Sequence, residues 1–296
     1  MLIAASGVLA AGCEEELDPG SRLDSFRVLA VQSDLPFARP GETVQLEALA
    51  VEPLGRDVSW AFATCSNPPS STVEGCLAQV AAAGGAFTSG AQGSFSFIVP
   101  ADALDAIRPE ARAVALAGVV SVACPGTLTV GASGALPFTC ADGVSGRELG
   151  LDEFVVGVKR VSVRAADRNA NPSIARVTFD GEDWAADDVK QVDACDAGGN
   201  SYDDCKRGAR YRIAALATEA SAESGVDEFG AAFSEQLIVQ YHATGGSFEH
   251  EVRIASDAET GWVAGRAVSG RELGVWFVLR DDRGGVSWAE RRVEVR

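Results

Sequence analysis

Apolar and polar residues alternate with a period of two along most of this chain. Between positions 43 and 50, Val44 and Leu46 alternate with Gln45 and Glu47. The same alternation recurs at 58–63, 211–215, 237–241 and 275–279. Successive side chains of a β-strand point to opposite faces, so this period predicts short strands with one buried face. Gly, Pro, Asp and Asn separate the strands, and the sequence therefore predicts an all-β sandwich fold.

Two shorter elements are predicted between the strands. Residues 281–285, Asp-Asp-Arg-Gly-Gly, separate two apolar runs and predict the turn of a final hairpin. Residues 101–106 predict a short helix, because Pro100 suits the first position of a helix and Asp102 and Asp105 are favourable near its N-terminus.

The length of 296 residues is typical of about two domains. A first module opens with a predicted strand at 26–31 and ends with the Val-rich stretch 153–164, before the Asp/Asn-rich run 167–172. We therefore expect a signal peptide at 1–12, an acidic tether at 13–24, a β-sandwich with disulfide loops at 25–166 and a second β-sandwich at 167–296.

One run carries a resemblance to a known class of domain. Residues 36–44, Pro-Phe-Ala-Arg-Pro-Gly-Glu-Thr-Val, resemble the passage from strand A to strand B of bacterial immunoglobulin-like and PKD-like domains, and Trp60 stands where such sandwiches place the core Trp of strand C. The resemblance implies two tandem immunoglobulin-like β-sandwich domains. Neither predicted strand B contains a cysteine, so the inter-sheet disulfide of antibody domains is not expected.

A heptapeptide, Val-Ser-Gly-Arg-Glu-Leu-Gly, occurs at 144–150 and again at 268–274. The offset is close to the length of one module, and each copy leads into an apolar stretch. We interpret the copies as equivalent positions in a duplicated domain. The alternative is a chance similarity between two loops of like composition.

Composition adds the sign of the surface charge. The chain has 42 Asp and Glu against 25 Lys and Arg, a net charge of −17. Such a surface repels phosphate backbones, so nucleic acid is excluded as an expected partner. No apolar stretch reaches the roughly 18 residues that a transmembrane helix needs.

The N-terminus resembles a bacterial lipoprotein signal. Residues 1–12 are apolar or small, and Leu9-Ala10-Ala11-Gly12-Cys13 resembles the lipobox, although no Lys or Arg precedes the apolar run. The resemblance implies lipidation of Cys13 and an anchor in the cell envelope. Glu14 follows the cysteine, so we expect the outer membrane, and the acidic run after it predicts a tether. A buried N-terminal strand is the alternative.

The remaining six cysteines are Cys65, Cys76, Cys124, Cys140, Cys195 and Cys205. An even number in an exported chain predicts disulfides. The cysteines fall into three sequence-local couples, which predicts the pairs 65–76, 124–140 and 195–205. The main alternative pairs Cys65 with Cys124, because each follows a predicted strand.

Acidic residues concentrate between 180 and 204, where nine carboxylates stand against Lys190 alone. Asp167, Asn169 and Asn171 in the linker resemble part of the calcium-binding linker of cadherins. Calcium takes about six to eight oxygen ligands, so the linker would have to recruit others. The candidate calcium ligands are Asp167, Asn169, Asn171, Asp180, Asp183, Asp196, Asp203 and Asp204. A solvated acidic face and an Asx turn are the alternatives.

Signals for catalysis are sparse. His242 and His250 are the two histidines and could share a metal if they lay on opposing hairpin strands, although strand residues facing solvent are the simpler interpretation. The sequence contains no nucleophile elbow, zinc-protease or phosphate-loop motif. Trp184, Trp262 and Trp288 could stack on sugars if exposed, and are otherwise core residues.

These patterns predict a non-catalytic, lipid-anchored envelope protein that acts in adhesion, scaffolding or binding. Its expected partner is a protein or a polysaccharide at the envelope. The alternative functions are an extracellular carbohydrate-binding protein and an accessory subunit of a secreted hydrolase. No cofactor other than calcium is expected.

Overall fold

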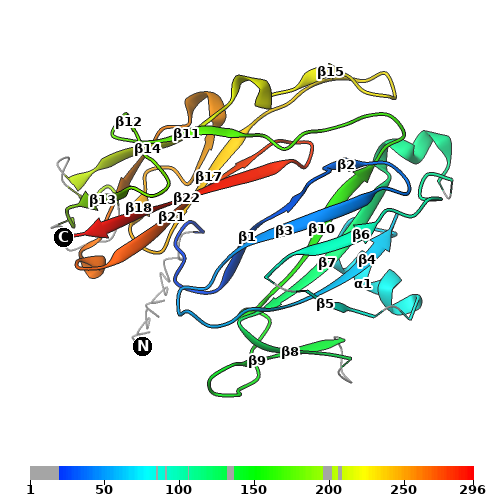
Figure 1. The fold of residues 1–296 in the computed structure, drawn as a ribbon, viewed down its shortest axis with the longest axis horizontal. Coiled ribbons are helices and arrows are strands. Elements are labelled where there is room, and N and C mark those ends of the chain that lie inside the picture. The colour runs from blue at the N-terminus through cyan, green and yellow to red at the C-terminus, as the bar shows by residue number, and fades with distance from the viewer. Residues whose placement is uncertain are drawn as a thin grey trace, which may run out of the picture.

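The protein folds into two β-sandwiches in tandem, the first running from β1 to β10 and the second from β11 to β22 (Figure 1). The computed structural model describes residues 20–84, 86–90, 92–105, 107–131, 137–195, 202–205 and 209–296. The expected fold class, all-β with immunoglobulin-like sandwiches, is confirmed.

The first sandwich packs a sheet of order β1-β3-β6 against a sheet of order β2-β10-β7-β4-β5. Its elements are β1 (Arg27–Ser33), β2 (Phe37–Ala38), β3 (Thr43–Val51), β4 (Ser59–Ser66), α1 (Val73–Ala82), β5 (Thr88–Gly90), β6 (Phe95–Ile98), the 3-10 helix η1 (Pro109–Val114), β7 (Leu116–Cys124), β8 (Gly126–Val130), β9 (Phe138–Asp142) and β10 (Val155–Val163). The strand β2 pairs in parallel with β10, so the chain changes sheets immediately after β1.

The alternation of apolar and polar residues along β3 places the apolar residues on the buried face of the strand. Val44 and Leu46 are buried in the core of the first sandwich, whereas Gln45 and Glu47 face solvent. Trp60 on β4 lies in the same core and stacks on Phe62. The prediction that Trp60 is a core residue of the third long strand is therefore confirmed.

The second sandwich repeats this plan with sheets of order β12-β11-β14-β20-β18 and β13-β22-β21-β17-β19. Its elements are β11 (Ile174–Phe179), β12 (Glu182–Asp183), β13 (Val189–Val192), β14 (Tyr211–Ala217), η3 (Glu219–Ser221), β15 (Ser224–Val226), β16 (Ala232–Ser234), β17 (Ile238–Ala243), β18 (Ser247–Phe248), β19 (Val252–Ile254), η4 (Ala255–Asp257), β20 (Thr260–Val263), η5 (Arg266–Val268), β21 (Glu272–Arg280) and β22 (Val286–Val295). A short strand, β13, again pairs in parallel with the last strand, β22.

The turn predicted at 281–285 joins β21 to β22 in a long antiparallel hairpin, as expected. The helix predicted at 101–106 was wrong: residues 101–105 form turns, in which the Ala103 N–H donates to the Pro100 carbonyl. The helix of this module is instead α1, which the sequence analysis did not predict. Thr72 caps it by accepting a hydrogen bond from the Gly75 N–H.

The three predicted disulfides are present. Cys65–Cys76 joins β4 to α1, Cys124–Cys140 joins β7 to β9, and Cys195–Cys205 closes a loop beside β20. The alternative pair Cys65–Cys124 is wrong. Each of these two cysteines lies on its own long strand, and the covalent partner of each comes from an insertion that covers the same sheet.

Residues 20–24, expected to belong to the tether, dock onto the second sandwich. The Leu23 N–H donates to the Ala243 carbonyl, and the Ala243 N–H donates to the Ser21 carbonyl. Leu23 is fully buried in a junction core, the cluster formed with β1, β21 and β22. This mostly polar segment therefore packs on the protein because the edge of β17 offers it backbone hydrogen bonds and the junction core offers an apolar site for Leu23.

The two heptapeptide copies adopt the same local turn at different places in the fold. In the first copy, the Gly146 N–H donates to the carbonyl of Asp142 on β9, and the Asp142 N–H donates to the Arg147 carbonyl. In the second copy, Gly270 and Arg271 make the same two hydrogen bonds with Val295 on β22. The first copy precedes the last strand of its sandwich and the second precedes the penultimate one. The interpretation as equivalent positions is therefore wrong.

Candidate functional site

Two connections meet at one end of the first sandwich, which we call the loop end: the β3–β4 loop (52–58) and the β7–β10 insertion (125–154). The insertion carries the β8–β9 hairpin, which extends beyond the body of the sandwich (Figure 1). Immunoglobulin-like folds commonly bind their ligands with loops gathered at one end, because the sheets behind them hold the loops in place. We therefore considered this end as a binding surface.

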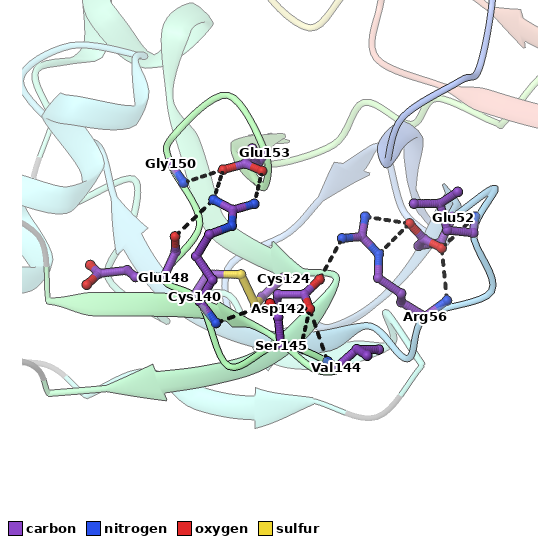
Figure 2. Close-up of polar contacts among 12 residues, drawn as sticks. Glu52, Arg56, Cys124, Cys140, Asp142, Val144, Ser145, Glu148, Gly150 and Glu153 are labelled. Carbon is purple, nitrogen blue, oxygen red and sulfur yellow. Dashed lines mark hydrogen bonds and ion pairs between the residues drawn. A yellow bond between two sulfur atoms is a disulfide. The ribbon is translucent and has the colours of Figure 1, made fainter.

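Arg56 connects the two loops. Its Nε and Nη2 donate to Oε1 of Glu52 at 2.9 and 2.6 Å, and its Nη1 donates to Oδ2 of Asp142 at 3.1 Å (Figure 2). Both carboxylates and the guanidinium are largely shielded from solvent. A partly buried, charge-assisted network of this kind fixes the two loops relative to each other.

Asp142 also fixes the turn that follows β9. Its Oδ1 accepts hydrogen bonds from the backbone of Val144 at 3.1 Å and from the backbone and hydroxyl of Ser145 at 2.7 and 2.9 Å. These bonds from Ser145, together with Arg56, hold the pKa of the Asp142 carboxyl well below its usual range. The turn is therefore ordered by a carboxylate that stays ionised.

A second ion pair closes the base of the insertion. Arg147 donates from Nη1 and Nη2 to the two oxygens of Glu153 at 2.9 and 2.6 Å, and the Gly150 N–H donates to Oε2 of Glu153 at 3.0 Å (Figure 2). The Arg147 hydrogen bonds and the Gly150 N–H lower the pKa of Glu153 to about 2. The segment 147–153 is thus a closed loop at neutral pH.

Apolar packing and a disulfide stiffen the same insertion. Cys124–Cys140 ties β9 to the end of β7, and around this bridge lies a small apolar cluster that includes Phe138, Leu149 and Phe154 together with Val122 of β7. The insertion is consequently packed onto the sheet of the first sandwich.

Apolar side chains point outward from these fixed loops. Leu54 is 72% exposed, Val144 89% and Leu151 66%. Exposed acidic residues stand beside them in the sequence: Asp57, Glu148 and Asp152. The buried carboxylates are occupied as hydrogen-bond acceptors, so the loop end presents exposed apolar side chains on fixed loops, with exposed acidic residues near them in the sequence, which makes it a candidate binding surface.

Sequence reasoning missed this site because its residues come from loops without periodicity. Two signals were available. Glu52 and Arg56 have the spacing of a local ion pair, and the first heptapeptide places a Val next to Ser-Gly, a combination that exposes an apolar side chain at a turn.

The linker residues predicted as calcium ligands form a hydrogen-bonded corner. Asp167 exchanges hydrogen bonds with Glu228, whose N–H donates to Oδ2 of Asp167 at 2.8 Å. Asn171 donates from Nδ2 to the Ser33 carbonyl at 2.7 Å and accepts at Oδ1 from the Val286 N–H at 3.0 Å. Oδ2 of Asp167 and Oδ1 of Asn171, which calcium would need, are engaged here in protein contacts.

Asn169 is buried between them and donates from Nδ2 to Oδ2 of Asp281 at 3.3 Å. Its Oδ1 has no hydrogen-bond partner among the described residues. Oδ1 of Asn169 and Oδ1 of Asp167 are far fewer than the six to eight oxygens that calcium takes, so the corner does not fit this ion without further ligands. The calcium site stays a prediction.

The acidic segment lies elsewhere. β11 separates Asn171 from Asp180, and at a rise of about 3.3 Å per residue the two are about 20 Å apart. Asp183 pairs with Arg176, and Asp203 and Asp204 are solvent-exposed near β20. Asp196 lies outside the described residues. The structure does not bring the described acids to the linker, and across the described ranges no three His, Cys, Asp or Glu side chains are arranged to hold a metal.

The two histidines do not lie on two paired strands, because His250 falls outside the strands. β17, which contains His242, pairs with β19 and β21, whereas His250 is an exposed residue between β18 and β19. Burial lowers the pKa of His242, so this side chain stays neutral at pH 7. A shared metal between them has no geometric support.

The three tryptophans do not form an exposed aromatic row. Trp184 and Trp262 are each 1% exposed in the core of the second sandwich, and Trp288 packs against the junction core. Their burial removes the main structural argument for a sugar-stacking platform. Cys13 and residues 1–12 lie outside the described residues. Within the described part, no helix is both long and apolar enough to cross a membrane.

Comparison with known proteins gives distant structural likenesses. No family model matches the chain, and no curated protein matches it. Among solved structures, it is similar to the N-terminal Ig1-2 module of the Drosophila receptor protein tyrosine phosphatase DLAR, with 7% identity, a TM-score of 0.26, and coverage of 92% of this chain and 99% of that chain. The two sandwiches described above define the class as a tandem immunoglobulin-like fold.

Two further solved structures are similar to parts of it. One is a nucleoside hydrolase-related hypothetical protein from Saccharophagus degradans that is associated with carbohydrate metabolism, at 18% identity and a TM-score of 0.24, covering 44% of this chain and 26% of that one. The other is dimeric latent PorU from Porphyromonas gingivalis, at 10% identity and a TM-score of 0.22, covering 92% and 24%. The chain spans about a quarter of the length of either protein.

Proposed function

We propose that this chain is a non-catalytic binding protein of the bacterial cell envelope, which uses the loop end of its first sandwich to bind a protein partner. The observation that carries the proposal is the exposure of Leu54, Val144 and Leu151 on loops that ion pairs and a disulfide hold rigid. Pre-organised apolar residues contribute most to binding, because little conformational entropy is lost when the partner covers them.

The acidic rim specifies the chemistry of the partner. Asp57, Glu148 and Asp152 surround the apolar residues in sequence, and the whole chain carries a net charge of −17. A partner surface with an apolar centre and a basic rim would be complementary to this end in polarity and in charge. Charge complementarity also accelerates association. A nucleic acid or an acidic polysaccharide would be repelled.

The anchor belongs to the same proposal. The lipobox-like residues before Cys13 support a lipid attached to this cysteine and retention at the outer membrane. Mass spectrometry of the chain isolated from its native host tests this part: a diacylated N-terminal Cys13 supports it, and an unmodified Cys13 contradicts it.

Site-specific photocrosslinking in the native host tests the binding surface. A photoreactive residue is placed at Val144, at Leu151, or at Ile254, an apolar residue of β19 that is 59% exposed and serves as the matched control. We expect the same protein to crosslink from Val144 and Leu151 and not from Ile254. Crosslinking of that protein from all three positions, or from none, contradicts the proposal.

Affinity for the crosslinked partner provides the second readout. We expect Val144→Asp to weaken binding by at least about tenfold, because it places a charge in the apolar contact. Ile254→Asp is expected to leave the affinity unchanged. Equal affinities for both variants would contradict the assignment of the loop end.

A further inference from the structure

A cleft of about 750 Å³ lies between the two sandwiches. Its walls come from β1 and β10 of the first sandwich and from the β21–β22 turn of the second. This volume is within the range of small-molecule sites, which are about 300–1,000 Å³ and combine apolar walls with a few convergent polar groups. The cleft is separate from the loop end.

Basic side chains converge on this cleft although the chain as a whole is strongly acidic. Lys159, Arg160 and Arg164 come from β10 and its end, and Arg280 and Arg283 come from the β21–β22 hairpin. Five of the 25 Lys and Arg residues therefore line one cavity. Four aspartates, Asp167, Asp227, Asp281 and Asp282, also line the cleft, so its cations are in slight excess, which favours an anionic ligand.

Three of these cations have evident structural roles. Arg283 pairs with Glu235 at 3.2 Å, and Arg164 donates to backbone carbonyls, including that of Ala113 at 2.8 Å. Arg160 is exposed and extends toward the hydroxyl of Ser71.

Lys159 and Arg280 are held by uncharged acceptors at the walls of the cleft, and neither forms an ion pair with a carboxylate in the described part of the chain. Lys159 donates to the Gly284 carbonyl at 2.8 Å. Arg280 donates from Nε to Gln240 at 2.7 Å and from Nη2 to the Leu29 carbonyl at 2.6 Å. Their contacts with neutral groups orient both side chains, and Asp281 lies close enough to Lys159 to act on it electrostatically without forming an ion pair.

The acidic residues of the cleft are already engaged. Asp281 accepts from the backbone of Arg283 and Gly285, and Asp227 accepts from the backbone of its own turn. Asp167 and Asp282 likewise accept backbone N–H groups. These four carboxylates therefore fix turns around the cleft, and none of them forms an ion pair with Lys159 or Arg280.

We propose that the cleft binds a small organic anion, whose carboxylate or phosphate group is held by Lys159 and Arg280 and whose apolar part lies against Val28, Val31 and Val158. Arg and Lys together suit oxyanions, since guanidinium donates two parallel hydrogen bonds and ammonium adds a point charge. The apolar wall formed by β1 and β10 gives such a ligand a place for its carbon skeleton.

The environment of the lysine agrees with this assignment. Burial, reinforced by the nearby charge of Arg280, lowers the pKa of Lys159 to about 8. Asp281 opposes this shift, and Arg160 adds to it. A bound anion would compensate the two positive charges that now disfavour each other.

Nuclear magnetic resonance titrations of the disulfide-bonded chain test the proposal with defined probes. The probes are benzoate, inorganic phosphate and the uncharged isostere benzamide, at constant ionic strength. We expect saturable shifts of the backbone amides of Gly157, Gly284 and Gly285 with benzoate or phosphate and none with benzamide. The two anions distinguish a carboxylate from a phosphate head group.

Variants and the pH dependence test whether the anion binds to Lys159 and Arg280. Lys159→Gln and Arg280→Gln are each expected to weaken anion binding by at least about tenfold, whereas Arg176→Gln on β11, an equal change of charge outside the cleft, leaves it unchanged. In the unsubstituted chain, affinity is expected to fall between about pH 7 and pH 9.5 as Lys159 loses its proton.

Absence of saturable shifts with both anions, shifts of equal size with benzamide, or equal affinities in Lys159→Gln and Arg176→Gln would each overturn the proposal. The wild-type titration and its pH dependence decide the question even if Arg280→Gln does not fold. Because the loop end plays no part in these measurements, their failure leaves the proposed function untouched.

Discussion

Arg283 shows how one side chain can link two domains. Its guanidinium lies 4.6 Å from the ring centroid of Phe37 in the first sandwich and 3.8 Å from that of Phe233 in the second, and it pairs with Glu235. The Glu235 side chain is completely buried, and this burial raises its pKa. A buried carboxylate of this kind depends on its cation, because desolvation otherwise makes its charge costly.

Replacing this arginine is therefore expected to destabilise the protein. We predict that Arg283→Leu lowers the free energy of unfolding by about 3 kcal/mol at neutral pH, since it leaves the Glu235 carboxylate buried without its cation. The pKa of Glu235 is raised in the folded state, so as the pH falls the folded protein binds this proton before the unfolded chain does. The deficit of the variant should therefore shrink between about pH 7 and pH 5.

Urea denaturation at both pH values measures this effect. Arg283→Lys, which keeps the charge but not the planar group over the rings, is expected to lose less stability. A deficit that does not depend on pH would show that lost ring packing, and not the stranded carboxylate, is the cause.

At the scale of elements, periodicity predicted most long strands, and local spacing predicted all three disulfides. The helix α1 was missed because it begins within the Cys65–Cys76 loop and has no strand periodicity, although Thr72 and Glu74 provide a capping residue and a first-turn acid. The repeated heptapeptide shows what a local sequence does not determine. Its seven residues form the same turn twice, but the strand beside each turn determines where in the fold that turn lies. The loop end and the cleft depend on contacts between distant segments, which no local pattern encodes.

The Cys124–Cys140 bridge allows the role of the β7–β10 insertion to be tested as an element. We predict that the double variant Cys124→Ala/Cys140→Ala loses about 3 kcal/mol of unfolding free energy, as expected for a loop of about 16 residues. Amide exchange in β8 and β9 should accelerate, and affinity for the crosslinked partner should fall.

The matched control is Cys65→Ala/Cys76→Ala, which removes the bridge between β4 and α1. This variant should lose similar stability and keep its affinity for the partner. If both double variants lose affinity equally, the rigidity of the insertion is not what prepares the loop end.

At the scale of the molecule, the two sandwiches share a core of their own. Leu23, Leu29 and Val51 from the N-terminal half pack with Trp276 and Val286 of the second sandwich. Polar contacts reinforce this junction core, including the bond from Gln32 to the Val286 carbonyl. Two domains joined by buried apolar side chains are expected to unfold together.

Leu23 is the side chain through which this cooperativity can be tested. We predict that Leu23→Asp, which places a charge at a fully buried position, splits the single calorimetric unfolding transition into two. Leu54→Asp makes the same chemical change at an exposed position and should leave one transition. Two transitions in the unsubstituted chain would show that the sandwiches are already independent.

The docking of Leu23 also determines how an anchored molecule would be oriented. Residues 14–20 can span at most about 25 Å, so a lipid on Cys13 would hold Ser21 and Leu23 close to the bilayer. Ser21 and Leu23 lie at the junction between the two sandwiches (Figure 1), and not at the far end of either sandwich. The two sandwiches would then be attached to the membrane at their junction, and the far end of each would be free to contact a partner. A pulling force on the anchor would act on the junction between the sandwiches before it acted on either sheet.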